Sequence, residues 1–327
     1  MQGPKIFYFC YDHQNPTGGQ KQVYRHVDIL NGHGRQAFVL HLERGFRLTW
    51  FDNTTRAISL DEFKGTYQAD RDVLVIPEDL GERILAFPGR KVIFNQNCYY
   101  GFSCFGLREP EIYPYLHPDI IGVFVVSDHN REYLSFAYPR LKIHRVYYGI
   151  DPERFAYRPL KEKKKMIACL PAKNSMEVAQ VYHQLISRSK QALNVLEDYE
   201  WVFIQNRSET EVTRILGDAL LFIFLSTNEG FGLMPLEAMA SGSLVVAYDS
   251  GASSEFLGPS NSFLSAPGDV LGIVRTVERI TSLFPGDTRE LQAVSEAALR
   301  GAREYSLQRE IESVVAAWQE ITGEIRP

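Results

Sequence analysis

The chain has 327 residues, of which 45% are hydrophobic and 23% are charged, and its net charge is −5 at neutral pH. This size predicts a globular protein of about two domains, and the negative charge argues against a nucleic-acid-binding protein. No apolar run reaches the roughly 18 residues of a membrane-spanning helix, and the N-terminus lacks the pattern of a signal peptide, so we expect a cytoplasmic location.

The first half of the chain alternates apolar runs of strand length with helical patterns. Strands are predicted at residues 6–10, 37–42, 73–77, 92–95, 121–126 and 143–147. The clearest helix runs from Gly19 to Leu30, where Val23, Val27 and Leu30 recur at helical spacing before an Asn-Gly-His-Gly stop.

The second half repeats the alternation, which together predicts an α/β protein with two doubly wound units. Its strands are predicted at residues 166–170, 201–204, 221–225 and 244–248. A charged segment, residues 154–165, separates the halves. Its Lys-Glu-Lys-Lys-Lys run at 161–165 predicts a solvated linker, with a patch that contacts anionic lipid as the alternative.

Residues 228–242 carry the most informative pattern of the chain. Glu229 follows a fully apolar run, as expected at the carboxyl end of a buried parallel strand. Pro235 is typical of a helix's first turn, which places Glu237 there too. Gly230 and Gly232 would let backbone N–H groups approach an anion or hydroxyl. These features predict a sugar-nucleotide site. The alternative is a solvated loop acid followed by a charge that only stabilises the helix dipole.

With the strand that follows, this segment reads EGFGLMPLEAMASGSLVV. It resembles the signature of retaining glycosyltransferases of the GT-B fold, of the family 4 type: Glu, seven residues, Glu. The resemblance implies two Rossmann-like doubly wound domains that face a cleft. It also implies that Glu229 holds donor-sugar hydroxyls, Glu237 holds the ribose, and the amides of Phe231, Gly232 and Leu233 face the sugar and phosphate.

Other segments are similar to the same family. Residues 143–151 match its interdomain passage, with Tyr148 where Asn is usual, and the amphipathic pattern after Ser306 resembles the final helix that returns to the first domain. The resemblance therefore implies a first domain at residues 1–152, with the returning helix at 306–327. The donor-binding domain would be residues 153–305.

Gly18 and Gly19 lie between the first strand and the first helix. In the resembling family, a Gly-Gly here faces the donor diphosphate and the acceptor pocket; the alternative is a tight turn. His13, in the same loop, could be a general base, a substrate ligand or a surface side chain. No G-x-G-x-x-G fingerprint follows the first strand, which disfavours an NAD-dependent dehydrogenase.

The family usually opens its second domain with G-R-L-x-x-E-K-G, whose Arg and Lys clamp the diphosphate. Here the segment is Ala-Cys-Leu-Pro-Ala-Lys-Asn, so Lys173 matches the Lys and the Arg is missing. Lys lacks the bidentate fork of Arg, so this departure predicts weaker donor binding unless another residue substitutes. The second domain is also short between residues 174 and 201.

The usual catalytic-cleft histidine of the first domain has no counterpart. Asn97 follows a strand at about this place and could contact acceptor or sugar, but an amide carries no proton at neutral pH. The family's proposed front-face reaction needs no protein nucleophile, since the leaving phosphate accepts the proton. Asp70-Arg71-Asp72 precedes a strand, and we expect no metal site and no cofactor.

We therefore predict a metal-independent retaining glycosyltransferase, of the kind used in polysaccharide biosynthesis. Its donor would be a nucleoside-diphosphate sugar, and its acceptor a hydroxyl of a glycan, a lipid-linked glycan or a small molecule. The alternatives are a GT-B epimerase or phosphorylase-like enzyme, and a non-catalytic protein that binds sugar nucleotides. Peripheral membrane contact is open, and the base, sugar, acceptor and oligomeric state are not specified by the sequence.

Overall fold

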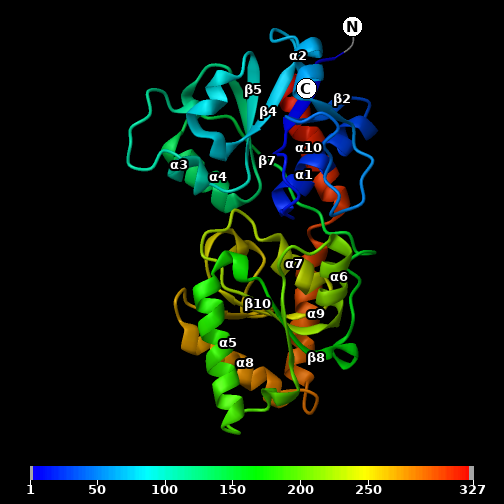
Figure 1. The fold of residues 1–327 in the computed structure, drawn as a ribbon, viewed down its shortest axis with the longest axis vertical. Coiled ribbons are helices and arrows are strands. Elements are labelled where there is room, and N and C mark those ends of the chain that lie inside the picture. Colours follow the sequence, from blue (N-terminus) through cyan, green and yellow to red (C-terminus); the bar gives the residue numbers. More distant parts are fainter. Residues whose placement is uncertain (1–2, 324–327) are drawn as a thin grey trace. The chain divides into compact units, whose positions relative to one another are not determined.

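The structure, a computed structural model, describes residues 3–323 (Figure 1). The chain divides into two compact units: unit 1 is Met1–Tyr148 with Gln308–Pro327, and unit 2 is Gly149–Leu307. The sequence placed these crossings after residues 152 and 305. Residues 324–327 of the expected final helix lie outside the described residues. No helix within 3–323 combines the length and apolar character that spanning a membrane requires.

Unit 1 is built on a seven-stranded sheet with the order β3-β2-β1-β4-β5-β6-β7. Neighbouring strands pair in parallel. The strands are β1 (Lys5–Phe9), β2 (Gln36–His41), β3 (Ala57–Ser59), β4 (Val73–Pro77), β5 (Arg90–Asn95), β6 (Ile120–Val125) and β7 (Ile143–Arg145). The helices are α1 (Gly18–Gly32), α2 (Leu60–Thr66), α3 (Tyr100–Ser103), α4 (Asp128–Ala137) and the returning α10 (Leu307–Thr322).

The structure confirms the strands predicted in unit 1. The apolar residues of the central strands are buried on both faces, as a parallel sheet covered by helices requires. Phe7, Leu74, Ile93 and Val123, one from each of four strands, join one core cluster. The sequence analysis missed β3, a three-residue strand whose apolar run is too short to show a period.

Helix α10 is tied to unit 1 by polar contacts as well as packing, and Figure 1 draws it beside α1. The Arg25 guanidinium pairs with the fully buried Glu310 carboxylate, with Nε 2.9 Å from Oε1. The indole N–H of Trp318 donates to the Tyr8 hydroxyl at 2.9 Å, in the middle of the first strand. The C-terminal helix is therefore an integral part of unit 1's core.

Unit 2 is built on a five-stranded sheet with the order β12-β11-β10-β8-β9, again paired in parallel. Its core cluster includes residues of β8, β10, β11, α5 and α8. The strands are β8 (Lys164–Cys169), β9 (Glu200–Phe203), β10 (Ala219–Phe224), β11 (Leu244–Tyr248) and β12 (Phe263–Ser265). The helices are α5 (Ser175–Lys190), α6 (Glu209–Asp218), α7 (Leu233–Ala240), α8 (Val270–Leu283) and α9 (Arg289–Arg303).

The run at residues 161–165 is not the solvated linker that its composition predicts. Lys164 begins β8 and pairs with Asp218, and Lys165 pairs with Asp198. Lys163 is only 6% exposed. Among residues 3–323, Lys161 is then the exposed lysine of this run that forms no ion pair, and a single such lysine does not favour the alternative of an anionic-lipid patch here.

The Lys163 ammonium joins the C-terminal ends of two helices. Its Nζ donates to the carbonyl oxygens of Leu216 at 2.9 Å and Gly217 at 3.0 Å, in the last turn of α6, and of Ser241 at 2.7 Å, just after α7. Helix C-termini carry partial negative charge and unpaired carbonyls, so a buried cation is stabilising there. These hydrogen bonds offset only part of the cost of burial, since burial and the nearby Arg158 charge lower the pKa of Lys163 from 10.5 to about 7.

The predicted stop of α7 at Gly242 is confirmed. Gly242 has φ of +85°, and a Cβ at this position would lie 2.3 Å from the Arg158 carbonyl oxygen. The Arg158 N–H donates to the Ser241 carbonyl at 3.1 Å. Only glycine allows the backbone leading into β8 to pass this close to the end of α7.

We predict that Lys163→Met lowers the free energy of unfolding by roughly 1–3 kcal/mol, because the Gly217 carbonyl loses its donor while the carbonyls of Leu216 and Ser241 keep the Ser243 hydroxyl and the Arg158 N–H. Lys165→Met is the matched control, since an exposed ion pair contributes about 0–1 kcal/mol. Urea denaturation followed by circular dichroism measures both. Equal destabilisation by the two substitutions would contradict the proposed helix-end role.

Candidate functional site

Each sheet has one point at which strand order reverses. In unit 2 the chain passes from β8 to β9 on one side and later returns to β10 on the other side. In unit 1 the reversal lies between β1 and β4. Loops diverge at such a point, and open α/β sheets bind ligands there, outside the carboxyl ends of the strands. The loops after β8 and β10, and after β1 and β4, are therefore the places to search.

The unit 2 reversal brings together the two residues predicted to be catalytic. Lys173 ends the short 3-10 turn after β8, Pro171–Lys173, and Glu229 lies in the loop after β10. The Lys173 Nζ is 2.8 Å from the Glu229 Oε1. Glu229 is 8% exposed, whereas the Lys173 side chain is 39% exposed. The carboxylate is therefore held in place, and the ammonium is accessible to a ligand.

Two more hydrogen bonds fix this pair. The Ser226 hydroxyl donates to the Glu229 Oε1 at 2.9 Å, so this oxygen is bound by both a hydroxyl and an ammonium. The Asn174 amide donates to the Leu225 carbonyl at 3.3 Å, and its Oδ1 accepts from the Glu177 N–H at the start of α5. Asn174 thereby joins the loop after β8 to the end of β10.

The turn into α7 differs in one respect from the prediction. Gly232 is the N-cap with φ of +91°, a left-handed conformation that disfavours any side chain. The helix starts at Leu233, so Pro235 is its third residue and Glu237 its fifth. Glu237 therefore lies in the second turn, not the first as predicted, because proline fits several positions of a first turn. It is half-buried.

The Phe231 ring belongs to the core of unit 2. It is 3% exposed and packs against Phe256 and Tyr305, with ring centroids at 5.3 Å and 5.4 Å. A ligand of this loop would therefore contact the Phe231 backbone and not its ring. The side chain instead anchors the loop that carries Glu229.

In unit 1, Gly18 and Gly19 are the first residues of α1, which Thr17 caps by accepting from the Gln20 N–H. A Cβ at Gly19 would lie 2.7 Å from the Gln96 Oε1. That oxygen accepts from the Tyr148 hydroxyl at 2.8 Å, and the Gln96 amide donates to the Gly19 carbonyl at 3.3 Å. Close packing accounts for Gly19, whereas Gly18 is exposed at the helix N-terminus.

His13 is exposed and its ring stacks on Tyr11, with centroids 6.3 Å apart and planes 16° apart. Its carbonyl oxygen accepts from the Gln20 side chain at 3.3 Å. The structure therefore gives the loop an ordered backbone and leaves the imidazole at the surface.

A buried carboxyl group that the sequence analysis did not identify lies at the unit 1 reversal. Glu78 directly follows β4 and is 5% exposed, and its Oε1 accepts from the Asn97 N–H at 2.7 Å. Burial raises the pKa of Glu78 from 4.5 to about 8, with Asp79 adding to the shift and backbone hydrogen bonds opposing it. The only sequence feature that could have identified Glu78 is its position directly after a predicted strand.

Asn97 itself is 7% exposed, and its Oδ1 accepts from the Tyr99 N–H at 3.0 Å. The chain thus brings Glu78 and Asn97 together through their own backbone and side-chain hydrogen bonds. Both lie at the carboxyl edge of the unit 1 sheet.

The Asp70-Arg71-Asp72 segment has a structural use. The Asp72 carboxylate is fully buried and accepts from the backbone N–H groups of Lys5 and Gln68, each at 3.0 Å. Within residues 3–323, no group of three or more His, Cys, Asp or Glu side chains has the arrangement of a metal site.

Comparison with known proteins places this geometry in context. Residues 184–291 match the family model described as glycosyl transferases group 1, a range that contains Glu229 and Glu237 but not Lys173. The chain is 26% identical over 253 residues to an alpha-1,6-glucosyltransferase of Actinobacillus pleuropneumoniae, covering 74% of this chain and 72% of that protein.

Two solved structures are similar over nearly the whole chain. Sucrose-phosphate synthase from Thermosynechococcus elongatus has a TM-score of 0.70 at 13% identity, covering 98% of this chain and 100% of that one. HepE of Anabaena, in complex with UDP, has a TM-score of 0.63 at 13% identity, covering 98% and 100%. The predicted fold is confirmed: the chain has the GT-B fold, and the group 1 match in its second unit supports a glycosyltransferase.

Proposed function

We propose that this protein is a retaining glycosyltransferase of the family 4 type, with a nucleoside-diphosphate sugar as donor. The acceptor would be a hydroxyl of a glycan, a lipid-linked glycan or a small molecule, as in polysaccharide biosynthesis. The observation that carries the proposal is the Lys173–Glu229 pair, which lies at the strand-order reversal of a unit matched by the group 1 model. HepE, a structural neighbour, binds UDP.

In this proposal, unit 2 binds the donor. Glu229 accepts hydrogen bonds from sugar hydroxyls through the oxygen that Lys173 and Ser226 leave available, and Glu237 accepts from the ribose. The amides of Phe231, Gly232 and Leu233 face the sugar and phosphate at the start of α7, where the helix dipole favours negative charge. Lys173 is the more exposed residue of the Lys173–Glu229 pair, and its ammonium would bind the diphosphate.

The proposed reaction proceeds on one face of the sugar. The bond from the anomeric carbon to the diphosphate breaks, the acceptor oxygen bonds to the same face, and the leaving phosphate oxygen takes the acceptor's proton. Charge on the departing diphosphate is greatest in the transition state, so Lys173 stabilises that state more than the bound donor. Glu229 positions Lys173 and the sugar without forming a covalent bond.

Unit 1 would bind the acceptor. Gly18 and the loop containing His13 lie after β1, and Glu78 and Asn97 lie after β4 and β5. A carboxyl group whose pKa is raised to about 8 is protonated at neutral pH, so Glu78 can contact an acceptor hydroxyl as a neutral group. We propose a cytoplasmic, metal-independent enzyme in which peripheral membrane contact is compatible with a lipid-linked acceptor.

The function is tested with a thermal-shift panel of UDP, GDP, dTDP and ADP sugars. We expect one donor to raise the melting temperature of the parent, since a ligand at 100 times its Kd stabilises by about 2.7 kcal/mol. Glu237→Ala should lose most of this shift because it removes the ribose contact. Glu296→Ala, an exposed helical glutamate elsewhere in unit 2, should keep it.

Transfer to acceptor must accompany binding. Release of nucleotide only when acceptor is present, unchanged by EDTA, supports the proposal. Donor binding without transfer would indicate a binding protein, and conversion of the donor sugar without acceptor would indicate an epimerase. Restoration of activity by manganese after EDTA would contradict metal independence.

We predict that Lys173→Ala lowers kcat at saturating donor by roughly a hundredfold or more, the cost of one preorganised donor to developing charge. Glu229→Gln should lower kcat as well, because Lys173 loses its carboxylate partner at 2.8 Å. The double variant should fall much less than the product of the two losses, since the residues act as one pair. Lys173→Arg should recover part of the rate. Independent, multiplicative losses would show that the pair does not act together.

We predict that the parent enzyme loses activity as pH rises through about 8, because Glu78 then ionises. Its raised pKa also means that the stability this group contributes is full below about 4.5 and is lost as pH rises through about 8. Glu78→Gln keeps a neutral donor of the same shape, so it should remove this part of both pH profiles. Glu111→Gln, on the exposed surface of unit 1, should leave both unchanged. If the Glu78→Gln variant keeps the pH dependence of the parent, the pH effect belongs to another group.

A further inference from the structure

Unit 1 contains a hollow of about 1020 Å³ away from the candidate site. Much of its lining comes from the amino ends of β5, β6 and β7: Arg90 starts β5, Ile120 starts β6, and Leu141 and Lys142 precede β7. Glu78, Asn97 and the glycines of α1 lie instead at the carboxyl edge of the same sheet. The hollow is therefore a separate feature from the proposed acceptor site.

One wall of the hollow is aromatic. Tyr138 stacks on Tyr115 and Phe102, with centroid distances of 5.0 Å and 5.7 Å, and Tyr113 lies 6.5 Å from it. Leu116, another lining residue, leaves 64% of its surface in solvent. Tyr115 and Tyr138 are only 4% and 7% exposed, so the apolar surface that a ligand could contact comes mainly from Leu116 and the partly exposed Phe102 and Tyr113.

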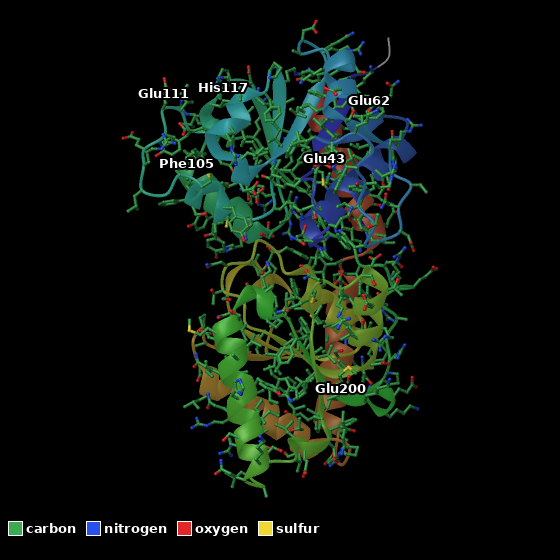
Figure 2. All side chains as sticks on the ribbon, in the orientation of Figure 1. Glu43, Glu62, Phe105, Glu111, His117 and Glu200 are labelled. Carbon is green, nitrogen blue, oxygen red and sulfur yellow. The ribbon has the colours of Figure 1, made fainter. Side chains whose placement is uncertain are left out.

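The hollow is also positively charged, although the chain carries a net charge of −5. Arg90, Arg140 and Lys142 line it, and no Asp or Glu does. Among the described residues, these three cations form no ion pair with a carboxylate, whereas five other arginines of unit 1 do. His117 also lines it, close to Asp119 at 3.8 Å, and is labelled in Figure 2.

Cations that lack a protein partner are available to an anion from outside. Arginine binds phosphate through two parallel N–H donors, and lysine adds a point charge. Inorganic phosphate would use the cations but make no contact with the exposed apolar lining at Leu116. A neutral alkyl compound would contact the apolar lining but would leave the cations without an anion. The lining fits a ligand that combines both chemistries.

We propose that this hollow binds an anionic amphiphile, with a phosphate group at Arg90, Arg140 and Lys142 and an apolar chain against Leu116 and the partly exposed Phe102 and Tyr113. A phospholipid head with the start of its chains and a soluble alkyl phosphate share this chemistry. A phospholipid in the hollow would hold the protein at a membrane surface, and a soluble alkyl phosphate would regulate its activity. In both cases the ligand would bind at a surface separate from the proposed reaction site.

The test uses the full chain and monomeric dodecyl phosphate, below its micellar concentration, in isothermal titration calorimetry. We expect saturable binding at one site, with no detectable binding of inorganic phosphate or of dodecyl maltoside at the same concentrations. Arg140→Gln with Lys142→Gln should weaken dodecyl phosphate binding at least tenfold, and Leu116→Ser should weaken it severalfold. Arg44→Gln with Lys64→Gln removes the same charge from exposed positions of unit 1 and should change nothing.

Vesicle sedimentation separates the two sources of ligand. Binding to phosphatidylglycerol but not phosphatidylcholine vesicles, lost in the Arg140 and Lys142 variant, would assign the hollow to a lipid surface. Binding of dodecyl phosphate without vesicle binding would assign it to a soluble amphiphile. The proposal is wrong if neither probe binds, if dodecyl maltoside binds equally well, or if the control variant weakens binding as much as the Arg140 and Lys142 variant.

Discussion

The parallel pairing of strands is the constraint on which the rest of this structure depends. Parallel neighbours require a crossover between each pair, so all carboxyl ends meet at one edge of a sheet. Where strand order reverses, between β8 and β10 in unit 2 and between β1 and β4 in unit 1, adjacent loops diverge and leave their polar groups without a covering element. The Lys173–Glu229 pair and the Glu78–Asn97 hydrogen bond lie at these two places. Topology explains why residues more than fifty positions apart in sequence, such as Lys173 and Glu229, lie within contact distance.

Two buried ionisable groups, one in each unit, are both shifted toward the neutral form by burial. Lys163 donates to three carbonyl oxygens at helix ends, and burial with the Arg158 charge still lowers its pKa from 10.5 to about 7. Glu78 accepts from the backbone N–H of Asn97, and burial raises its pKa to about 8. The two groups differ in position: Lys163 joins the ends of two helices, whereas Glu78 lies at the strand-order reversal of its sheet. That difference is why we place Lys163 in the architecture and propose Glu78 for the site.

Long apolar runs and the 228–242 segment made the strands, the GT-B fold and the Lys173–Glu229 region predictable from sequence. The strands β3 and β12 were missed because a strand of three residues carries too little periodicity. Lys163 was misjudged because composition averages over a run, whereas burial is decided residue by residue. Glu237 was placed one turn early because proline marks a helix's first turn without fixing its position. Glu78 belongs to no motif. Its burial and its contact with Asn97, which follows the neighbouring strand β5, are visible only in the folded chain. The cationic hollow joins residues at or before the amino ends of β5, β6 and β7, and their spacing in sequence shows no pattern.

The contacts of Lys163 also limit how this chain can vary in length. The Lys163 ammonium binds carbonyls in the last turn of α6 and just after α7, and Lys163 directly precedes β8. These three parts of the chain are therefore held together at one nitrogen. An insertion in the last turn of either helix would move its carbonyls away from the nitrogen, and a deletion before β8 would withdraw the nitrogen from both. Length changes should therefore accumulate elsewhere in unit 2, such as the exposed turn between α5 and β9, while the distance from this lysine to the start of α7 stays constant. The helix carrying Glu237 would then keep its place relative to β8, and with it the spacing between Glu237 and Lys173, however far surrounding loops diverge.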